Sequence, residues 1–122
     1  MKIPLKVSIN NFYNTLLILM RKFPYIRDLR PKEMEVLAEI MLQNYNNRSI
    51  KDFNKRQIVI FSTEGRELMR NNLRLKAVQF NNYIKVLKQK NVLTKDNRLV
   101  PFFDIVPAGN AYSLDFKFQI YE

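Results

Sequence analysis

The side chains in this sequence that are best suited to recognising another molecule are amides and ammonium groups on one face of an expected helix over residues 76–90. At about 100° per residue, a polar and an apolar face separate. The polar face holds Gln79, Asn82, Lys85, Val86 and Gln89, and the opposite face holds Ala77, Phe80, Tyr83, Ile84 and Leu87. Amides can pair with adenine, a lysine with guanine or phosphate, and a valine with a thymine methyl group, as readout of the DNA major groove requires. The solvated face of an ordinary amphipathic helix would have the same composition, so this alternative stays open.

Basic side chains flank this helix at both ends. Residues 74–98 carry seven basic and one acidic side chain, a net charge of +6 in a chain whose formal charge is +10. Such a concentration of positive charge favours a polyanionic partner, because neutralising phosphates releases counterions. The expected phosphate contacts are Arg74, Lys76, Lys88 and Lys90. The candidate nucleic-acid-binding residues are therefore Arg74, Lys76, Gln79, Asn82, Lys85, Lys88, Gln89 and Lys90.

The composition argues against an enzyme. The chain has no Cys and no His, which excludes disulfides, the usual zinc sites and histidine acid–base catalysis. Its eleven acidic side chains are scattered, and with only two glycines it has no phosphate-binding loop. We expect no enzymatic activity, cofactor, metal or small-molecule substrate. The apolar run 16–20 is too short for a membrane span, so we expect no membrane partner and take the cytoplasm as the default location.

A chain of 122 residues is long enough for a single core, which we divide into an N-terminal arm and helix, residues 1–28, and a domain, residues 29–122. The alternation in Lys2–Ser8 predicts an extended arm, and Pro4 restricts it to an edge strand or a free extension. It can pair with the domain's own sheet or with a neighbouring subunit. A helix apolar on more than one side follows, from residue 10 or 11 to about 22, and either fills the core or also contacts a partner protomer.

The remaining elements follow from local composition. Pro31 suits the first turn of a helix, and Ser62 or Thr63 can cap another. A polar, asparagine-rich stretch predicts a loop, and β-branched or alternating stretches predict strands. The expected elements are a helix over 31–42, a loop over 43–54, a strand over 56–61, a helix over 64–72, the helix over 76–90, and two strands over 98–106 and 111–121 that form a β-hairpin.

Two stretches resemble a known family. The spacing Leu73-x-Leu75, Phe80, Tyr83-Ile84, Leu87 and Asn91-Val92 resembles the second half of a winged helix-turn-helix of the kind found in many bacterial repressors, with Arg74 and Asn91 where that family commonly has glycine. The phrase Leu-x-Pro-x-Glu-x-x-Val-Leu at 29–37 resembles the first helix of such domains. The resemblance implies an α+β fold: a winged helix-turn-helix with an N-terminal extended arm and helix and a C-terminal β-hairpin wing.

These features predict a basic DNA-binding protein, a regulator of transcription or replication, that reads duplex DNA with residues 76–90 and forms a homo-oligomer. The wing would play a minor part, because residues 99–122 have a net charge of −2 and the turn at 107–110 has no basic side chain. The alternative is a small structural or assembly protein, such as a phage virion or packaging component, that uses the fold for protein contacts. The extended arm, the many-sided apolar helix and the acidic hairpin support this alternative, which would place the protein in the virion.

Overall fold

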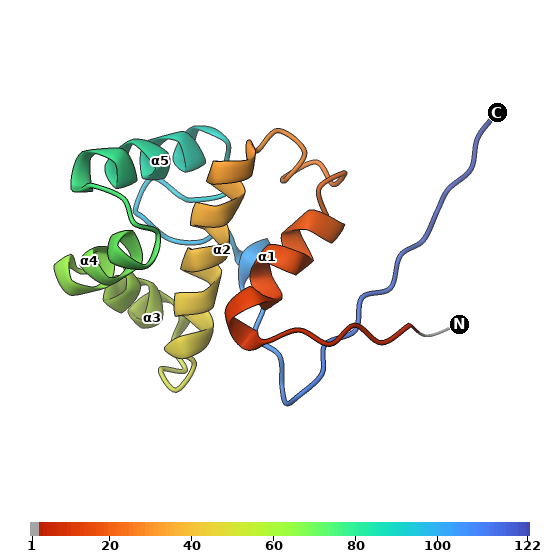
Figure 1. Cartoon of the computed structure of the whole chain (residues 1–122), viewed down its shortest axis with the longest axis horizontal. Coiled ribbons are helices and arrows are strands. Elements are labelled where there is room, and N and C mark those ends of the chain that lie inside the picture. Colours follow the sequence, from red (N-terminus) through yellow and green to blue (C-terminus); the bar gives the residue numbers. More distant parts are fainter. Residues whose placement is uncertain (1–2) are drawn as a thin grey trace.

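The structure is a computed structural model that describes residues 3–122, and its regular elements are helices (Figure 1). They are α1 (Ile9–Leu19), α2 (Pro31–Asn46), α3 (Phe53–Ile60), α4 (Thr63–Asn72) and α5 (Ala77–Gln89), followed by the short 3₁₀ turn η1 (Pro101–Phe103). The one β feature among residues 3–122 is an isolated antiparallel bridge between Leu93 and Leu99. The α+β class and the β-hairpin wing predicted from the sequence are therefore wrong, because the described chain is all-helical.

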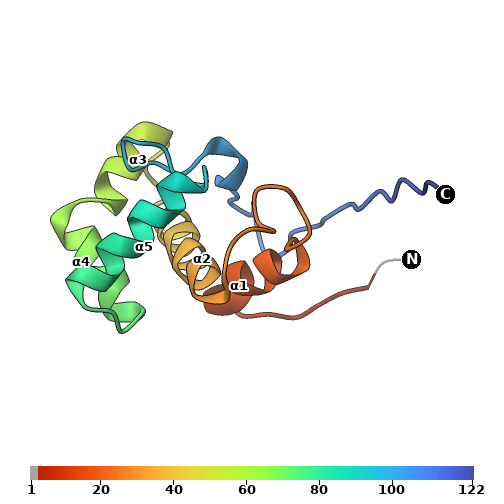
Figure 2. The same ribbon diagram turned by 90° about the horizontal axis from the view of Figure 1, so that it is seen from above.

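Helix α2 is the centre of the core. Its fully buried side chains are Val36, Leu37, Ile40 and Met41. They are buried because α1 packs along one side of α2, while α3, α4 and α5 pack along the other (Figures 1 and 2). Pro31 occupies the first turn as expected, and the Arg30 backbone N–H donates to Glu33 Oε1 at 3.0 Å. The helix continues past its predicted end at residue 42 to Asn46, because buried polar side chains in its last turns find partners.

Residues 56–61, predicted as a strand, belong mostly to helix α3. Asp52 caps this helix through a 2.9 Å hydrogen bond from the backbone N–H three residues further on. Arg56 and Gln57 both donate to one atom, Asn44 Oδ1, at 3.2 and 2.9 Å. Neighbouring side chains of a strand point to opposite faces, so a strand would direct these two apart. The contact with α2 therefore overrides the β-branched composition of the segment.

A partly buried polar network continues from α3 to the chain after α5. The Asp104 carboxylate accepts hydrogen bonds from Arg56 at 3.1 Å and from Asn44 at 2.8 Å. The Leu99 backbone N–H donates to Gln57 Oε1 at 3.1 Å. Each of these groups is satisfied by another member of the network, as buried polar groups require. The network holds residues 99–104 against α2 and α3.

This attachment explains why the predicted hairpin is absent. Residues 98–106 contain the bridge, η1 and the contacts of Asp104, so they do not run as a free strand. Residues 111–121 are extended, but their backbone makes no hydrogen bond within the described chain. Their first half packs through two edge-on aromatic pairs, Tyr112 with Phe12 and Phe116 with Phe23, at ring-centroid distances of 5.7 and 5.8 Å. An alternating pattern thus gives an extended chain here, but a sheet also needs a partner backbone.

The N-terminal part has two sections. The predicted arm begins at Lys2, which lies outside the described residues, and residues 3–8 are extended without a sheet partner in the described chain. Helix α1 ends at Leu19 instead of about residue 22 and shares one hydrophobic core with the other helices. The Tyr13 hydroxyl donates to the Ile105 carbonyl at 2.6 Å and so ties α1 to the chain after η1. Among the described residues, no helix combines the length and apolar character needed to cross a membrane.

Candidate nucleic-acid interface

Helices α4 and α5 are joined by a short turn, residues 73–76. Arg74 has φ +56°, in the left-handed region, and the Leu75 backbone N–H donates back to the Arg70 carbonyl at 2.8 Å. The side chains of Leu73 and Leu75 are half-buried against the core, while that of Arg74 is exposed. The turn therefore fixes the direction of α5 and leaves a cation at its entrance.

Close packing between α3 and α4 positions the first helix of this pair. Ser62 Oγ accepts a hydrogen bond from the Gly65 backbone N–H at 3.1 Å and so caps α4. A Cβ atom on Gly65 would overlap the Ile60 carbonyl oxygen, closer than any real contact of this kind. Glycine is thus required where α4 passes the end of α3.

Helix α5 has a buried and an exposed face as its sequence predicts, except that Ala77, predicted on the buried face, is exposed. Phe80, Ile84 and Leu87 are buried in the core. Opposite them, Asn82, Lys85 and Gln89 are exposed at positions that form one stripe along the helix. The structure thus brings three of the candidate DNA-reading side chains together on a free surface.

The first turn of α5 adds two cations and a capping amide. Arg74 and Lys76 are exposed at the end of α5 where the stripe begins. Gln79 is exposed as well, but its Oε1 accepts a hydrogen bond from the Lys76 backbone N–H at 3.0 Å. Gln79 therefore stabilises the start of the helix, and its amide NH₂ is the group that points to other partners.

Two candidate residues at the other end of α5 are less available. Lys88 is half-buried, and Lys90 forms an ion pair with Glu33 while donating to the Asp28 carbonyl at 2.8 Å. Burial raises the pKa of the Glu33 carboxyl, but hydrogen bonds from the Arg30 backbone and Lys90 outweigh it and hold that pKa below its ordinary value. Lys90 therefore attaches α5 to the first turn of α2, and the structure does not place it on the exposed stripe.

Sequence reasoning missed three exposed residues near the stripe. Val78 is 71% exposed and lies one turn before Asn82, so it, and not the half-buried Val86, is the free apolar group of this face. Asn81 is exposed beside it. Lys95 is exposed in a tight turn closed by a 2.8 Å hydrogen bond from Thr94 N–H to the Arg98 carbonyl. The turn-forming composition Thr-Lys-Asp-Asn is the signal that could have located it.

The sequence of α5 and its flanking residues is rich in positive charge. Residues 68–95 contain seven basic and no acidic side chains. Arg98, just beyond them, donates to Asn54 Oδ1 at 3.0 Å. The first turns of α4 carry the exposed Glu64 and Glu67, so the positive surface with amide groups along its centre belongs to α5 and its flanking turns, and this is the composition that a nucleic acid requires.

Comparison of the chain with known protein families, with curated proteins and with solved structures finds no match. Its interface has therefore to be interpreted from its own geometry and charge.

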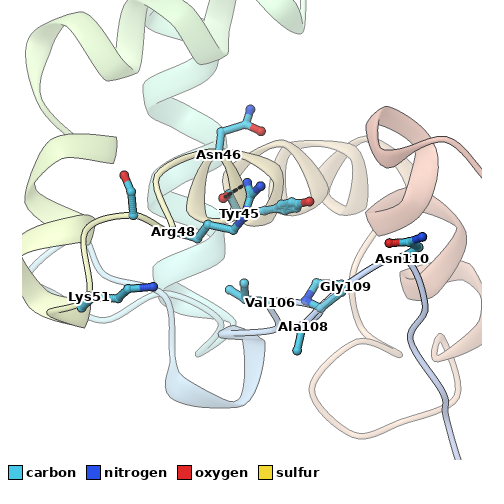
Figure 3. Close-up of a pocket in the computed structure, with 10 residues that line it drawn as sticks. Tyr45, Asn46, Arg48, Lys51, Val106, Ala108, Gly109 and Asn110 are labelled. Carbon is cyan, nitrogen blue, oxygen red and sulfur yellow. Dashed lines mark hydrogen bonds between the residues drawn. The ribbon is translucent and has the colours of Figure 1, made fainter.

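A second basic surface lies at the C-terminal end of α2 (Figure 3). It is an open cleft of about 840 Å³ between the α2–α3 connection and residues 106–110. Arg48 lies 4.0 Å from the centroid of the Tyr45 ring and donates to that residue's carbonyl at 3.1 Å, while Lys51 lies at the far rim. Both basic side chains are exposed, and Arg48 is already engaged by Tyr45. The cleft adds positive charge, but its side chains do not converge on one point (Figure 3).

Proposed function

We propose that this protein binds double-stranded DNA by placing α5 in the major groove. The observation that carries the proposal is the exposed stripe of Asn82, Lys85 and Gln89 on a helix whose other face is buried. An α-helix fits the major groove, and amide and ammonium groups match the base edges found there. The protein then acts as a regulator of transcription or replication without a β-hairpin wing, so α5 and its flanking turns supply the contacts.

Each side chain has a definite part in this proposal. Asn82 pairs with adenine, Lys85 reaches guanine or phosphate, and Val78 meets a thymine methyl group. Arg74 and Lys76 hold phosphates beside the first turn of α5, where the positive end of the helix dipole adds to their charge.

The residues at the other end of the helix complete the set. Gln89 continues the amide stripe, while Lys88 before it and Lys95 after it supply positive charge. Lys90 acts indirectly, because its ion pair with Glu33 orients α5 on α2.

The test is the affinity of the purified protein for a short random-sequence duplex, measured by fluorescence anisotropy over a range of salt concentrations. We expect steep weakening with salt, since each neutralised phosphate releases counterions. Lys85→Glu should weaken binding at least about tenfold at low salt. The control Lys51→Glu makes the same charge change in the cleft beyond the C-terminal end of α2 and should weaken DNA binding much less. Equal losses in the two variants, or no loss with Lys85→Glu, would contradict binding through α5.

A second candidate, an assembly subunit such as a virion component, is favoured by a different observation. The arm and the C-terminal residues expose apolar side chains far from α5, among them Ile3, Leu5, Phe118 and Ile120. For a protein whose role is assembly alone, Lys85→Glu would leave assembly unchanged and the native protein would bind duplex DNA weakly even at low salt. Removing residues 1–8 would then be the damaging change.

A further inference from the structure

Two extended segments project from the helical body on the side of α1 (Figures 1 and 2). We call residues 3–8 the arm and residues 111–122 the tail. The arm runs toward the body and the tail runs away from it, so the two have opposite directions. Apart from the Ser8 carbonyl, which accepts from Asn11 at the start of α1, neither makes a backbone hydrogen bond within the described residues. Both therefore carry free donors and acceptors of the kind that form a sheet.

The side chains of both segments alternate in the same way. Ile3, Leu5 and Val7 alternate with polar residues or Pro4 in the arm, and Tyr112, Leu114, Phe116, Phe118 and Ile120 alternate with more polar residues in the tail. Phe118 is 86% exposed and Ile120 is 91% exposed. The tail is anchored only in its first half, where Phe116 packs on Phe23. Beyond that point, one face of the tail is apolar and uncovered, as in a strand without its partner.

We propose that the arm of one copy of this chain pairs with the tail of a second copy, so that the two segments form the interface of a dimer. A two-stranded ribbon is at best marginally stable in water, and one chain can supply no more than two strands here. Two copies supply four, which is enough to cover an apolar face. A twofold axis repeats the arm–tail contact, as in most dimers.

Charge favours the same partner. The tail carries Asp115 and Glu122 against Lys117, whereas the arm carries Lys6 and no acidic side chain. The tail of one copy is therefore attracted to the arm of another. The interface lies on the side of α1, away from α3 and α4, so pairing leaves the exposed stripe of α5 free (Figure 1). The proposal goes beyond DNA binding and does not depend on it.

The first test is sedimentation equilibrium of the full chain over a wide range of concentrations. The double variant Phe118→Ser/Ile120→Ser changes only exposed side chains, so its helical circular dichroism should match that of the native protein. We expect its dimer Kd to be at least about tenfold weaker, because two apolar side chains lose their buried environment. The control Lys117→Ser/Gln119→Ser changes the opposite face of the same segment and should weaken the dimer much less. A native protein that stays monomeric throughout, or a dimer unaffected by the first variant, would overturn the proposal.

The second test identifies which segments meet, using the fact that the chain has no cysteine. Lys6→Cys and Lys117→Cys are prepared separately, mixed, and treated with a short bismaleimide cross-linker. If the arm of one copy pairs with the tail of another, the mixture should give a cross-linked dimer that contains one chain of each variant. The control Glu67→Cys, on α4, should give no such product with Lys6→Cys. A cross-link that forms only within single chains carrying both Lys6→Cys and Lys117→Cys would show that the arm and tail pair within one chain. It would exclude pairing between two copies.

Discussion

Lys90, where α5 ends, forms an ion pair with Glu33 in the first turn of α2, and the same Glu33 oxygen accepts the Arg30 backbone N–H that begins that turn. One carboxylate therefore caps the start of the central helix and also anchors Lys90, the first residue after α5. The Glu33 side chain is almost fully buried, and that of Lys90 is only partly exposed. The orientation of the candidate DNA-reading helix thus depends on a contact at its far end.

Replacing Lys90 with Met should destabilise the fold. The substitution keeps the apolar part of the side chain but leaves the Glu33 carboxylate with one fewer donor in a buried place. We expect the free energy of unfolding to fall by about 1 to 3 kcal/mol at neutral pH, measured by urea denaturation. Lys88→Met, two residues earlier, removes a half-buried lysine that has no ion pair within the described residues, and should change stability much less.

The same pair gives a defined pH dependence. Because the pKa of Glu33 is lowered in the folded protein, its stabilising effect is present above the ordinary value of 4.5 and is lost as the pH falls through the lowered pKa. The stability difference between the native protein and Lys90→Met should therefore be largest at neutral pH and shrink well below 4.5. A difference that stays constant with pH would assign the loss to packing instead of the ion pair.

Glu39 should behave in the opposite way. Burial raises its pKa, and a 2.8 Å hydrogen bond from Asn72 only partly offsets this effect. A raised folded-state pKa gives stability that is present below 4.5 and lost as the pH rises through the raised value. Glu39→Gln keeps an acceptor for Asn72 without the charge, so it should raise the free energy of unfolding at neutral pH by less than about 1 kcal/mol.

The matched control for Glu39 lies on the same helix. Glu35 forms an exposed pair with Lys32, so Glu35→Gln should leave stability nearly unchanged. Urea denaturation at neutral pH and again below 4.5 distinguishes the two variants. Stabilisation by Glu39→Gln that persists in acid would contradict the role given to its charge.

Gly65→Ala should destabilise the protein although helix propensity alone favours Ala. The added Cβ would overlap the Ile60 carbonyl oxygen and lie 2.6 Å from that of Val59, so α3 and α4 would have to move apart. We expect a loss of about 1 to 3 kcal/mol in urea denaturation. Asn71→Ala, at an exposed position of the same helix, should give a small gain. If both variants showed the same small increase in the free energy of unfolding, α3 and α4 would be able to move apart with little loss of stability.

Local sequence signals were sufficient for some elements and not for others. Helix α5 could be predicted because its apolar residues recur with the helical period and its polar residues fall opposite them. Helix α3 could not, because the hydrogen bonds of Arg56 and Gln57 to Asn44 join residues 12 and 13 positions apart in sequence and override a β-branched composition. The tail shows a third case, in which an alternating pattern predicted a strand but the described chain provides no backbone to pair with it, so the strand prediction was wrong.

The residues of the candidate interface also fall into those that the local sequence predicts and those that it does not. Exposure of Asn82 and Lys85 follows from the helical period alone. The position of Lys90 does not, since its partner Glu33 is 57 residues away and sequence gives only the sign of its charge. Lys95 was missed because the turn at residues 94–98, which the composition Thr-Lys-Asp-Asn favours, was not predicted. Residues whose role depends on distant contacts thus required the structure.

Arg74 offers a prediction in which stability and binding change in opposite directions. Its φ of +56° is unfavourable for a residue with a Cβ atom, so Arg74→Gly should raise the free energy of unfolding by up to about 1 kcal/mol. The same change removes a proposed phosphate contact, so duplex affinity should fall and the slope of log affinity against log salt should decrease by about one phosphate. Urea denaturation and salt-dependent anisotropy measure the two effects separately.

Asn91→Gly is the control for this pair of measurements, because Asn91 has a similar φ of +64° but carries no charge. It should stabilise the fold less, since asparagine tolerates the left-handed region, and it should leave the salt slope unchanged. If Arg74→Gly is more stable yet binds the duplex as the native protein does at every salt concentration, the turn is strained but Arg74 holds no phosphate. A glycine at this position would then be better for the fold at no cost to binding, and the first-turn contacts of α5 would have to be assigned to Lys76 alone.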